Sequence, residues 1–192
     1  AFAKSAPRYA TANLEFHFQP LSLDKWGDGL HPFGAFTASV CNLNPTSRGS
    51  VHLKSPDPNA APAISPNYLA TEEDRQVAID ALKLARRIVA QAPLARFNPQ
   101  EYLPGPGHDS EEALVEAAAR IGTTIFHPAG TAKMGRDDDP MAVLDQRLRV
   151  RGVAGLRVID ASVMPAITSG NTAAPTVMIG EKGAQMIRED AR

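Results

Sequence analysis

Residues 13–18 alternate strictly between apolar and polar side chains, which is the pattern of a strand with one buried face. Because successive side chains of a strand point to opposite faces, His17 and its neighbour Glu15 share one face. The apolar set faces the other way and consists of Leu14, Phe16 and Phe18. The pattern predicts a strand whose apolar face covers a core.

Two further strands are predicted downstream, at residues 36–43 and at residues 50–54. The intervening residues 44–49 (NPTSRG) have the composition of a turn. We therefore expect a hairpin between these two strands, and an antiparallel sheet in the first third of the chain.

Two helices are predicted in the middle third. Thr71 precedes three acidic residues, an arrangement that caps a helix and complements the positive end of its dipole. We expect this helix to end at Pro93. Its apolar stripe consists of Val77, Ala81, Leu84 and Ile88. A second helix is expected between Ser110 and Gly122.

The last third returns to short segments. Apolar or alternating patterns predict strands at residues 123–126, 147–151 and 156–160. A final helix is expected over residues 172–189, with Pro175 in its first turn, where the missing N–H costs nothing. Its small residues would let the helix approach a sheet closely, and they are Gly180, Gly183 and Ala184. The predicted fold class is α+β, an antiparallel sheet flanked by helices.

Composition excludes some functions and leaves others open. The chain has 192 residues, 21% of them charged, with a formal net charge of −1, so no basic surface for nucleic acid is indicated. No run approaches the length of a membrane span, although membrane association is left open. Cys41 is the only cysteine and is expected to be a small buried residue. No histidine or cysteine spacing indicates a metal site.

Three segments carry the candidate chemistry: residues 127–135 (HPAGTAKMG), 156–165 (LRVIDASVMP) and 169–181 (SGNTAAPTVMIGE). They resemble the C-terminal signature of the glucose–methanol–choline (GMC) oxidoreductases, most closely the choline dehydrogenase-like members. Residues 44–68 are similar to the substrate domain of that family. The resemblance implies that residues 1–155 form a substrate-binding domain that includes the His127 loop. It also implies that residues 156–192 supply a strand and helix of an FAD-binding domain.

The resemblance implies that His127 and Asn171 form the catalytic pair. Imidazole titrates near neutrality, so His127 can accept the proton of an alcohol hydroxyl as hydride leaves for flavin N5. Neutral Asn171 cannot act as a base, but it can orient the alcohol oxygen by a hydrogen bond. The purely structural alternatives are a buried core histidine for His127 and a helix-cap or turn residue for Asn171.

FAD is the implied cofactor, held at the start of the final helix. Backbone N–H groups and the helix dipole favour negative charge there, and a reduced flavin carries such charge. The implied cofactor-binding residues are Asp160, Ala161, Asn171, Thr172 and Thr176. Asp160 could instead be a simple strand-end cap.

His17 is the implied substrate-binding residue, because family members often place a histidine on this strand. The alternative is an exposed strand face. The remaining histidines lie in turn-rich contexts and are expected to be structural: His31, His52 and His108.

The chain lacks the G-x-G-x-x-G turn that cradles the FAD pyrophosphate, since Gly105-Pro-Gly107 is a proline-bearing loop. We therefore expect a piece of a longer enzyme, roughly its last third, which alone binds FAD poorly. Its expected partners are the missing FAD-binding region and an alcohol substrate, with choline one option among several alcohols. Without their parent sheet, the strand and helix from residue 156 onward would expose an apolar face that includes Val177, Ile179 and Ile187, so we expect them to dock irregularly, to self-associate or to be poorly ordered.

Two other functions fit the same residues. One is a hydroxynitrile lyase of the same fold, and the other is a non-catalytic binding module that retains the motifs. No signal peptide is present, so a cytoplasmic location is the expectation.

Overall fold

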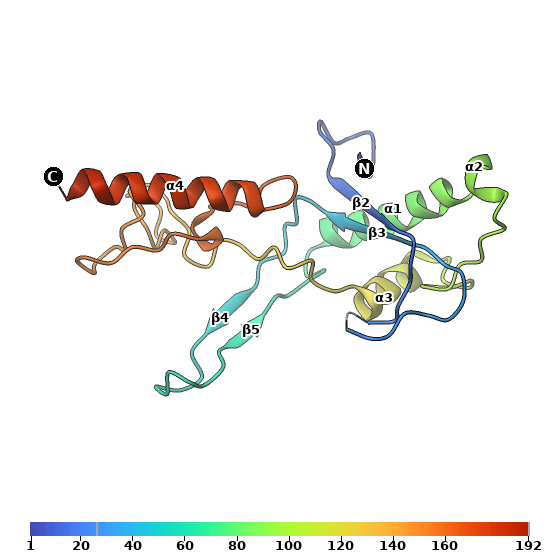
Figure 1. Cartoon of the computed structure of the whole chain (residues 1–192), viewed down its shortest axis with the longest axis horizontal. Helices are drawn as coiled ribbons and strands as arrows, with labels where there is room; N and C mark the ends of the chain where they lie inside the picture. The colour runs from blue at the N-terminus through green and yellow to red at the C-terminus, as the bar shows by residue number, and fades with distance from the viewer. Residues whose placement is uncertain (26, 192) are drawn as a thin grey trace. The chain divides into compact units, whose positions relative to one another are not determined.

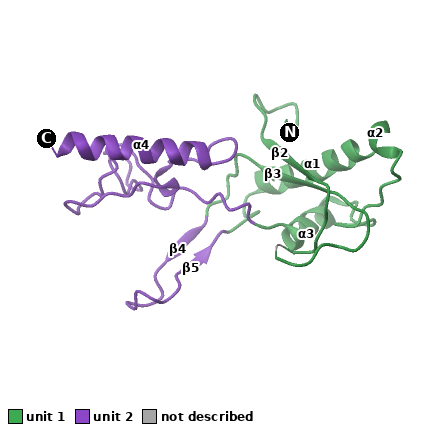
Figure 2. Cartoon of the chain, viewed as in Figure 1, with its two compact units in different colours: residues 1–48, 67–123 green, residues 49–66, 124–192 purple. Residues whose placement is uncertain are grey.

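The computed structural model describes residues 1–25 and 27–191. The chain divides into two compact units (Figure 2). Unit 1 comprises residues 1–48 and 67–123, and unit 2 comprises residues 49–66 and 124–192. Small antiparallel sheets and helices make up the described chain, so the α+β class is confirmed at that level (Figure 1). The predicted assignment of residues 1–155 and 156–192 to substrate and FAD domains is a different division and stays a prediction.

Unit 1 is built on a three-stranded antiparallel sheet in the order β1-β2-β3. The strands are β1 (Phe2–Ala3), β2 (Leu14–Gln19) and β3 (Thr37–Asn42). The predicted strands at residues 13–18 and 36–43 are confirmed as β2 and β3. In the register, Glu15 lies opposite Cys41 and His17 lies opposite Ser39. Cys41 is half-buried, and burial together with the charge of Glu15 raises the pKa of its thiol.

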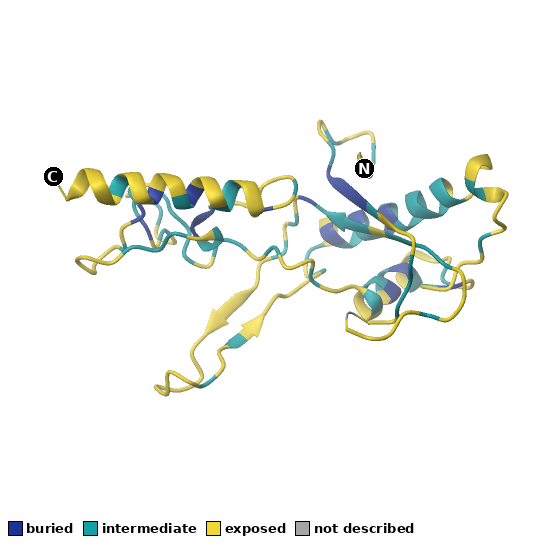
Figure 3. Cartoon of the chain, in the orientation of Figure 1, coloured by how far each residue is buried: buried dark blue, intermediate teal, exposed yellow. Residues whose placement is uncertain are grey.

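Helix α1 (Glu72–Val89) covers the apolar face of this sheet. The Thr71 hydroxyl accepts a hydrogen bond from the Asp74 backbone N–H at 3.3 Å, so the predicted cap is confirmed. Leu14 and Phe16 of β2 pack on Val77 and Ala81 of the helix, and all four are buried; Figure 3 shows buried residues in dark blue on both β2 and α1. Phe18 departs from the expected buried face, because it lies 48% exposed near the end of the strand.

Two more helices complete unit 1. Helix α3 (Glu111–Ile121) begins at Ser110, whose hydroxyl accepts from the Ala113 N–H at 3.1 Å, as predicted. Helix α2 (Ala92–Ala95) was not predicted. Pro93 lies in its first turn and does not end α1, which stops at Val89 before the proline is reached. The expectation for Pro93 was wrong because proline fits the first turn of a helix as well as it breaks the interior of one.

The expected hairpin across residues 44–49 is also wrong. Strand β4 (Ser50–His52) pairs with β5 (Ala63–Ser65), not with β3. The turn-like segment is instead tied to the start of α1, since the buried Asp74 carboxylate accepts from the Thr46 and Ser47 N–H groups at 2.9 and 2.8 Å. Burial alone would raise the pKa of Asp74, but these hydrogen bonds outweigh it and hold the pKa below its ordinary value.

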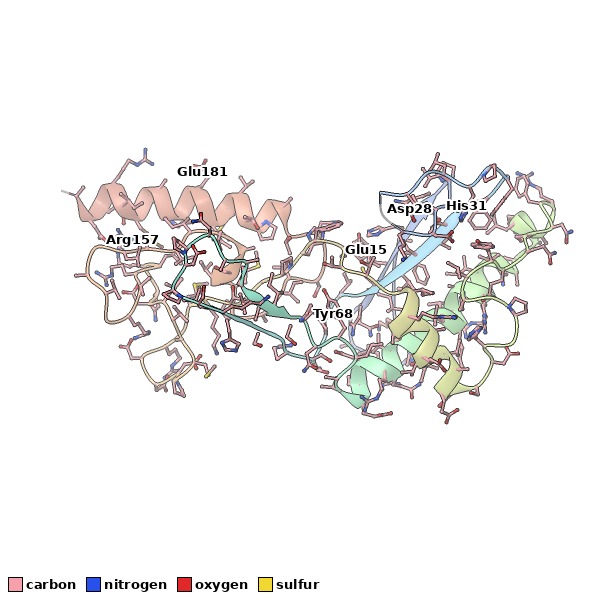
Figure 4. All side chains as sticks on the ribbon, turned by 90° about the horizontal axis from the view of Figure 1, so that it is seen from below. Glu15, Asp28, His31, Tyr68, Arg157 and Glu181 are labelled. Atoms are coloured by element: carbon pink, nitrogen blue, oxygen red, sulfur yellow. The ribbon has the colours of Figure 1, made fainter. Side chains whose placement is uncertain are left out.

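Unit 2 contains the hairpin β4–β5, a set of loops, a short 3₁₀ helix η1 (Ala161–Val163) and helix α4 (Ala173–Asp190). The final helix is confirmed close to its expected bounds. The hydrophobic core of unit 2 is formed by Leu144, Leu148, Val163, Met164 and Ile179. In Figure 4, Glu181 lies on α4 and Arg157 lies on the loops packed along that helix. Arg157 donates to the Asp190 carboxylate near the end of α4.

The three short strands expected in the last third do not form. Phe126 has a φ of 64° and Leu148 a φ of 63°, which is left-handed backbone that no strand contains. Within residues 147–160, pairing is limited to isolated bridges such as Arg149 with Arg157. In the segments 147–151 and 156–160 the apolar side chains of Leu148, Val150, Val158 and Ile159 belong to the unit 2 core or pack against it, without forming a ladder.

Helix α4 exposes part of its apolar surface, as expected. Val177 is 67% exposed and Ile187 is 44% exposed, whereas Ile179 is buried in the core, contrary to the prediction. Gly183 is the position of close approach, because a Cβ there would lie 2.6 Å from a side-chain carbon of Ile159. Gly180 makes no such contact. Among the helices of residues 1–25 and 27–191, none combines the length and apolarity needed to cross a membrane.

Candidate active site around His127 and Asn171

His127 lies in a loop that is fastened to the η1 segment of unit 2. The Ala132 N–H donates to the Ser162 carbonyl at 3.1 Å, and the Met134 N–H donates to the Val163 carbonyl at 2.8 Å. Gly130 takes a φ of 87°, and a Cβ there would lie 3.3 Å from the Met164 carbonyl oxygen. Glycine therefore suits both the turn and the close approach that follow His127.

The structure brings His127 and Asn171 together, although 43 residues separate them in the sequence. The side-chain nitrogen of Asn171, Nδ2, lies 3.2 Å from His127 Nε2. On the other side of the ring, Thr172 Oγ1 lies 2.8 Å from His127 Nδ1. Both contacts lie within unit 2. The imidazole is thus held at both nitrogens by consecutive residues.

The two contacts fit one tautomer of His127. An amide nitrogen is a donor only, so the Asn171 contact fits a ring in which Nε2 accepts the hydrogen bond. In neutral imidazole the proton would then reside on Nδ1 and be donated to Thr172 Oγ1. His127 is half-buried and Asn171 is exposed, and Nε2 is the ring nitrogen that faces Asn171. This arrangement can accept a proton from a hydroxyl group.

The start of α4 follows directly. Ala173 and Ala174 are exposed, and the first turn contains no acidic residue. Thr176 closes this turn by donating from its N–H and its hydroxyl to the Thr172 carbonyl, at 3.0 and 2.7 Å. The positive end of the helix dipole is therefore open and uncompensated by a carboxylate of the turn, which suits an anionic group such as the edge of a reduced flavin.

The neighbouring predicted residues behave differently. Asp160 Oδ1 accepts from the Ser162 N–H at 2.8 Å and also from the Ser162 hydroxyl, so Asp160 caps η1. Ala161 is the first residue of that turn and is half-buried. The Asp160 side chain thus acts as a cap, which was the alternative interpretation of this residue. Its predicted role at the cofactor stays a prediction.

His17 belongs to unit 1, on β2. Its Nε2 lies 3.2 Å from a carboxylate oxygen of Glu15, and its side chain is 36% exposed. Glu15 is buried, and its other carboxylate oxygen, Oε2, has no hydrogen-bond partner. The sequence placed His17 and Glu15 on one face, but it did not predict this contact. The predicted substrate contact of His17 stays a prediction.

Thr172 is the residue whose part in the site the sequence analysis missed. It was expected to act only at the cofactor, yet its side chain contacts the histidine. No sequence signal distinguishes a threonine that contacts the histidine from one that caps its own helix.

Comparisons with known proteins identify the family to which the chain is similar. A family model described as GMC oxidoreductase matches residues 45–180. An alcohol dehydrogenase (acceptor) of Pseudomonas putida is 41% identical over 97% of this chain and 33% of its own length. An oxygen-dependent choline dehydrogenase 1 of Chromohalobacter salexigens is 43% identical over 92% of this chain and 31% of its own length. The chain thus spans about a third of the length of the curated relatives it matches.

Solved structures with the same fold carry related names. The crystal structure of pyridoxine 4-oxidase from Mesorbium loti matches with a TM-score of 0.87 and 30% identity, over 98% of this chain and 37% of the other. A formate oxidase of Aspergillus oryzae RIB40, studied for FAD modification, matches with a TM-score of 0.82 and 26% identity, over 94% of this chain and 32% of the other. These relatives are named as oxidases or dehydrogenases, so they give no support to the lyase alternative.

Proposed function

Because the chain belongs to the GMC oxidoreductase family, we propose that it is the proton-handling part of an FAD-dependent enzyme that oxidises an alcohol. The observation that carries this proposal is the pair of contacts that hold His127 between Asn171 and Thr172, with Nε2 facing the Asn171 amide.

His127 Nε2 is the proposed general base. A substrate hydroxyl placed between the two side chains would donate to His127 Nε2 and accept from Asn171 Nδ2, replacing their direct contact of 3.2 Å. The hydroxyl proton then passes to Nε2, while the hydrogen on the carbinol carbon leaves as hydride and a carbonyl group forms. When bound, FAD supplies the two-electron acceptor for that hydride at N5. Asn171 holds the oxygen in place throughout.

The backbone of residues 172–176 is the proposed contact with the anionic edge of the flavin, together with residues 160–161. Support comes from the open helix start, whose exposed Ala173 and Ala174 would let a ring system approach the backbone. Thr176 contributes by closing the turn through the Thr172 carbonyl. The nucleotide portion of FAD needs residues that these segments do not supply.

The proposed substrate class is a primary alcohol, in line with the alcohol and choline dehydrogenases among the relatives. His17 is proposed to contact the substrate from β2.

The test uses the flavin-loaded enzyme that contains this chain. Anaerobic mixing with choline, benzyl alcohol and short aliphatic alcohols should bleach the flavin absorbance with at least one of them, and deuterium on the carbinol carbon should slow that step. Asn171→Ala should lower the rate by about 10²-fold, as loss of an oriented hydrogen bond to the reacting oxygen does. Asn59→Ala, in an exposed turn of the β4–β5 hairpin, is the control and should leave the rate unchanged. An enzyme reduced by dithionite but by none of these alcohols would overturn the proposal.

A further inference from the structure

Thr172 contacts His127 on the side of the ring away from Asn171. Its hydroxyl oxygen lies 2.8 Å from His127 Nδ1, which is a short hydrogen bond. Thr172 is only 6% exposed, although Asn171 before it and Ala173 after it are both exposed. Water therefore has little access to this contact, and loss of the hydroxyl would leave the Nδ1 proton without a ready partner.

The backbone at Thr172 explains why its hydroxyl is available. A threonine at a helix start commonly accepts from an N–H of the first turn, with its own backbone extended. Thr172 instead has φ −86° and ψ −4°, and its side chain makes no capping hydrogen bond. Its carbonyl accepts two hydrogen bonds from Thr176, which fix the backbone at this residue. The hydroxyl is left to face the histidine.

We infer that Thr172 is a positioning residue that fixes the tautomer and the ring orientation of His127. By accepting a hydrogen bond from Nδ1–H, Thr172 leaves the lone pair on Nε2, beside Asn171, where the proposed function needs the base. The inference deepens that proposed function and rests on it for its role in catalysis. The tautomer itself is a property of unit 2 alone and can be measured without flavin or substrate.

Long-range ¹H–¹⁵N correlation spectra of the chain, labelled with ¹⁵N-histidine, give the direct test. At a pH of about 8.5, where an ordinary histidine is neutral, the wild-type His127 should show the proton on Nδ1. Thr172→Val removes the acceptor at similar volume and should shift His127 towards the Nε2–H tautomer or a mixture. Thr172→Ser should retain the Nδ1–H form.

Thr37→Val is the matched control, because the Thr37 hydroxyl also makes a 2.8 Å hydrogen bond, to the Leu21 carbonyl in unit 1. It should leave the His127 signals unchanged. A wild-type His127 with the proton on Nε2 would overturn the inference even if Thr172→Val failed to fold. So would a Thr172→Val chain whose His127 tautomer matched the wild type.

In the flavin-loaded enzyme, Thr172→Val should slow flavin reduction by about tenfold with little change in substrate affinity, and Thr172→Ser should restore the rate. The two proposals fail separately. If Thr172→Val changes the tautomer while removal of the His127 imidazole leaves alcohol oxidation intact, the proposed function is wrong and the positioning contact stands. If the tautomer does not respond to Thr172, the contact has no positioning role whatever the activity.

Discussion

Gly183 offers a sharp test of how α4 is held against unit 2. An added Cβ at Gly183 would lie 2.6 and 2.8 Å from two side-chain carbons of Ile159. At Gly180, one turn earlier on the same helix, an added Cβ would meet no atom within 4 Å. Alanine substitutions at these two positions should therefore change the stability of the fold in opposite directions.

The magnitudes follow from the contact distances. Carbon atoms prefer a separation of about 3.5–4.0 Å, so Gly183→Ala requires a shift of about 1 Å between α4 and Ile159. Isoleucine is β-branched and stiff at χ1, so the backbone must move, which costs about 1–3 kcal/mol. Alanine is better than glycine inside a helix by about 1 kcal/mol. Gly183→Ala should thus destabilise the fold by about 1 kcal/mol, while Gly180→Ala should stabilise it by up to about 1 kcal/mol.

Urea unfolding followed by circular dichroism measures the two variants against the wild type, and hydrogen exchange of the α4 amides reports the local effect. We expect midpoints that move to opposite sides of the wild type, and faster exchange in α4 for Gly183→Ala only. Equal stabilisation by both alanines would refute the close packing of α4 on Ile159.

Three further predictions concern the elements that support the fold. Asp74→Ala should lower the free energy of unfolding by about 1–3 kcal/mol, because it removes the buried carboxylate that accepts from the N–H groups of residues 46–47, whereas exposed Glu72→Gln should have little effect. The pKa of Asp74 is depressed in the fold, so its stabilisation is full above about pH 4, the unfolded value. It is lost as the pH falls through the folded pKa, so wild type and variant should converge in acid urea titrations. Ser110→Ala should cost about 1 kcal/mol in the same assay by removing the α3 cap, with Ser110→Asp as the rescuing control; no loss, or no rescue, would contradict the cap. Gly49→Ala should disrupt the β4–β5 pairing seen by NMR, since its Cβ would lie 2.2 Å from the Ser65 carbonyl oxygen; unchanged cross-strand contacts would contradict that packing.

Short sequence signals correctly predicted the starts of two helices. Thr71 and Ser110 cap their helices as expected, because a cap depends on a few consecutive residues. Strand pairing depends on residues far apart in the sequence, and the predicted hairpin between residues 36–43 and residues 50–54 was wrong. Residues 44–49 look like a turn, but Asp74 holds them, and nothing in the turn itself indicates that carboxylate. The left-handed backbone at Phe126 and Leu148 likewise gives no sequence signal, since neither is a glycine or an asparagine.

The candidate site was predicted only in part. The motifs identified His127 and Asn171, and the structure brings the two side chains into contact. Thr172 was assigned to the cofactor alone, because a sequence motif does not show that a helix-start hydroxyl turns away from its own helix towards an imidazole. The contact between Glu15 and His17 was missed for a similar reason, since two side chains on the same face of a strand need not touch.

The central claim is that His127 is the base of an alcohol-oxidising flavoenzyme, and its most direct test is anaerobic stopped-flow reduction of the flavin by the best alcohol substrate. The measurement compares wild type with His127→Gln, which keeps a polar side chain of similar size but cannot accept the proton at neutral pH. The account predicts a fall of about 10²–10⁴-fold in the reduction rate, with flavin content and spectrum unchanged. Reduction at the wild-type rate in the variant would contradict it.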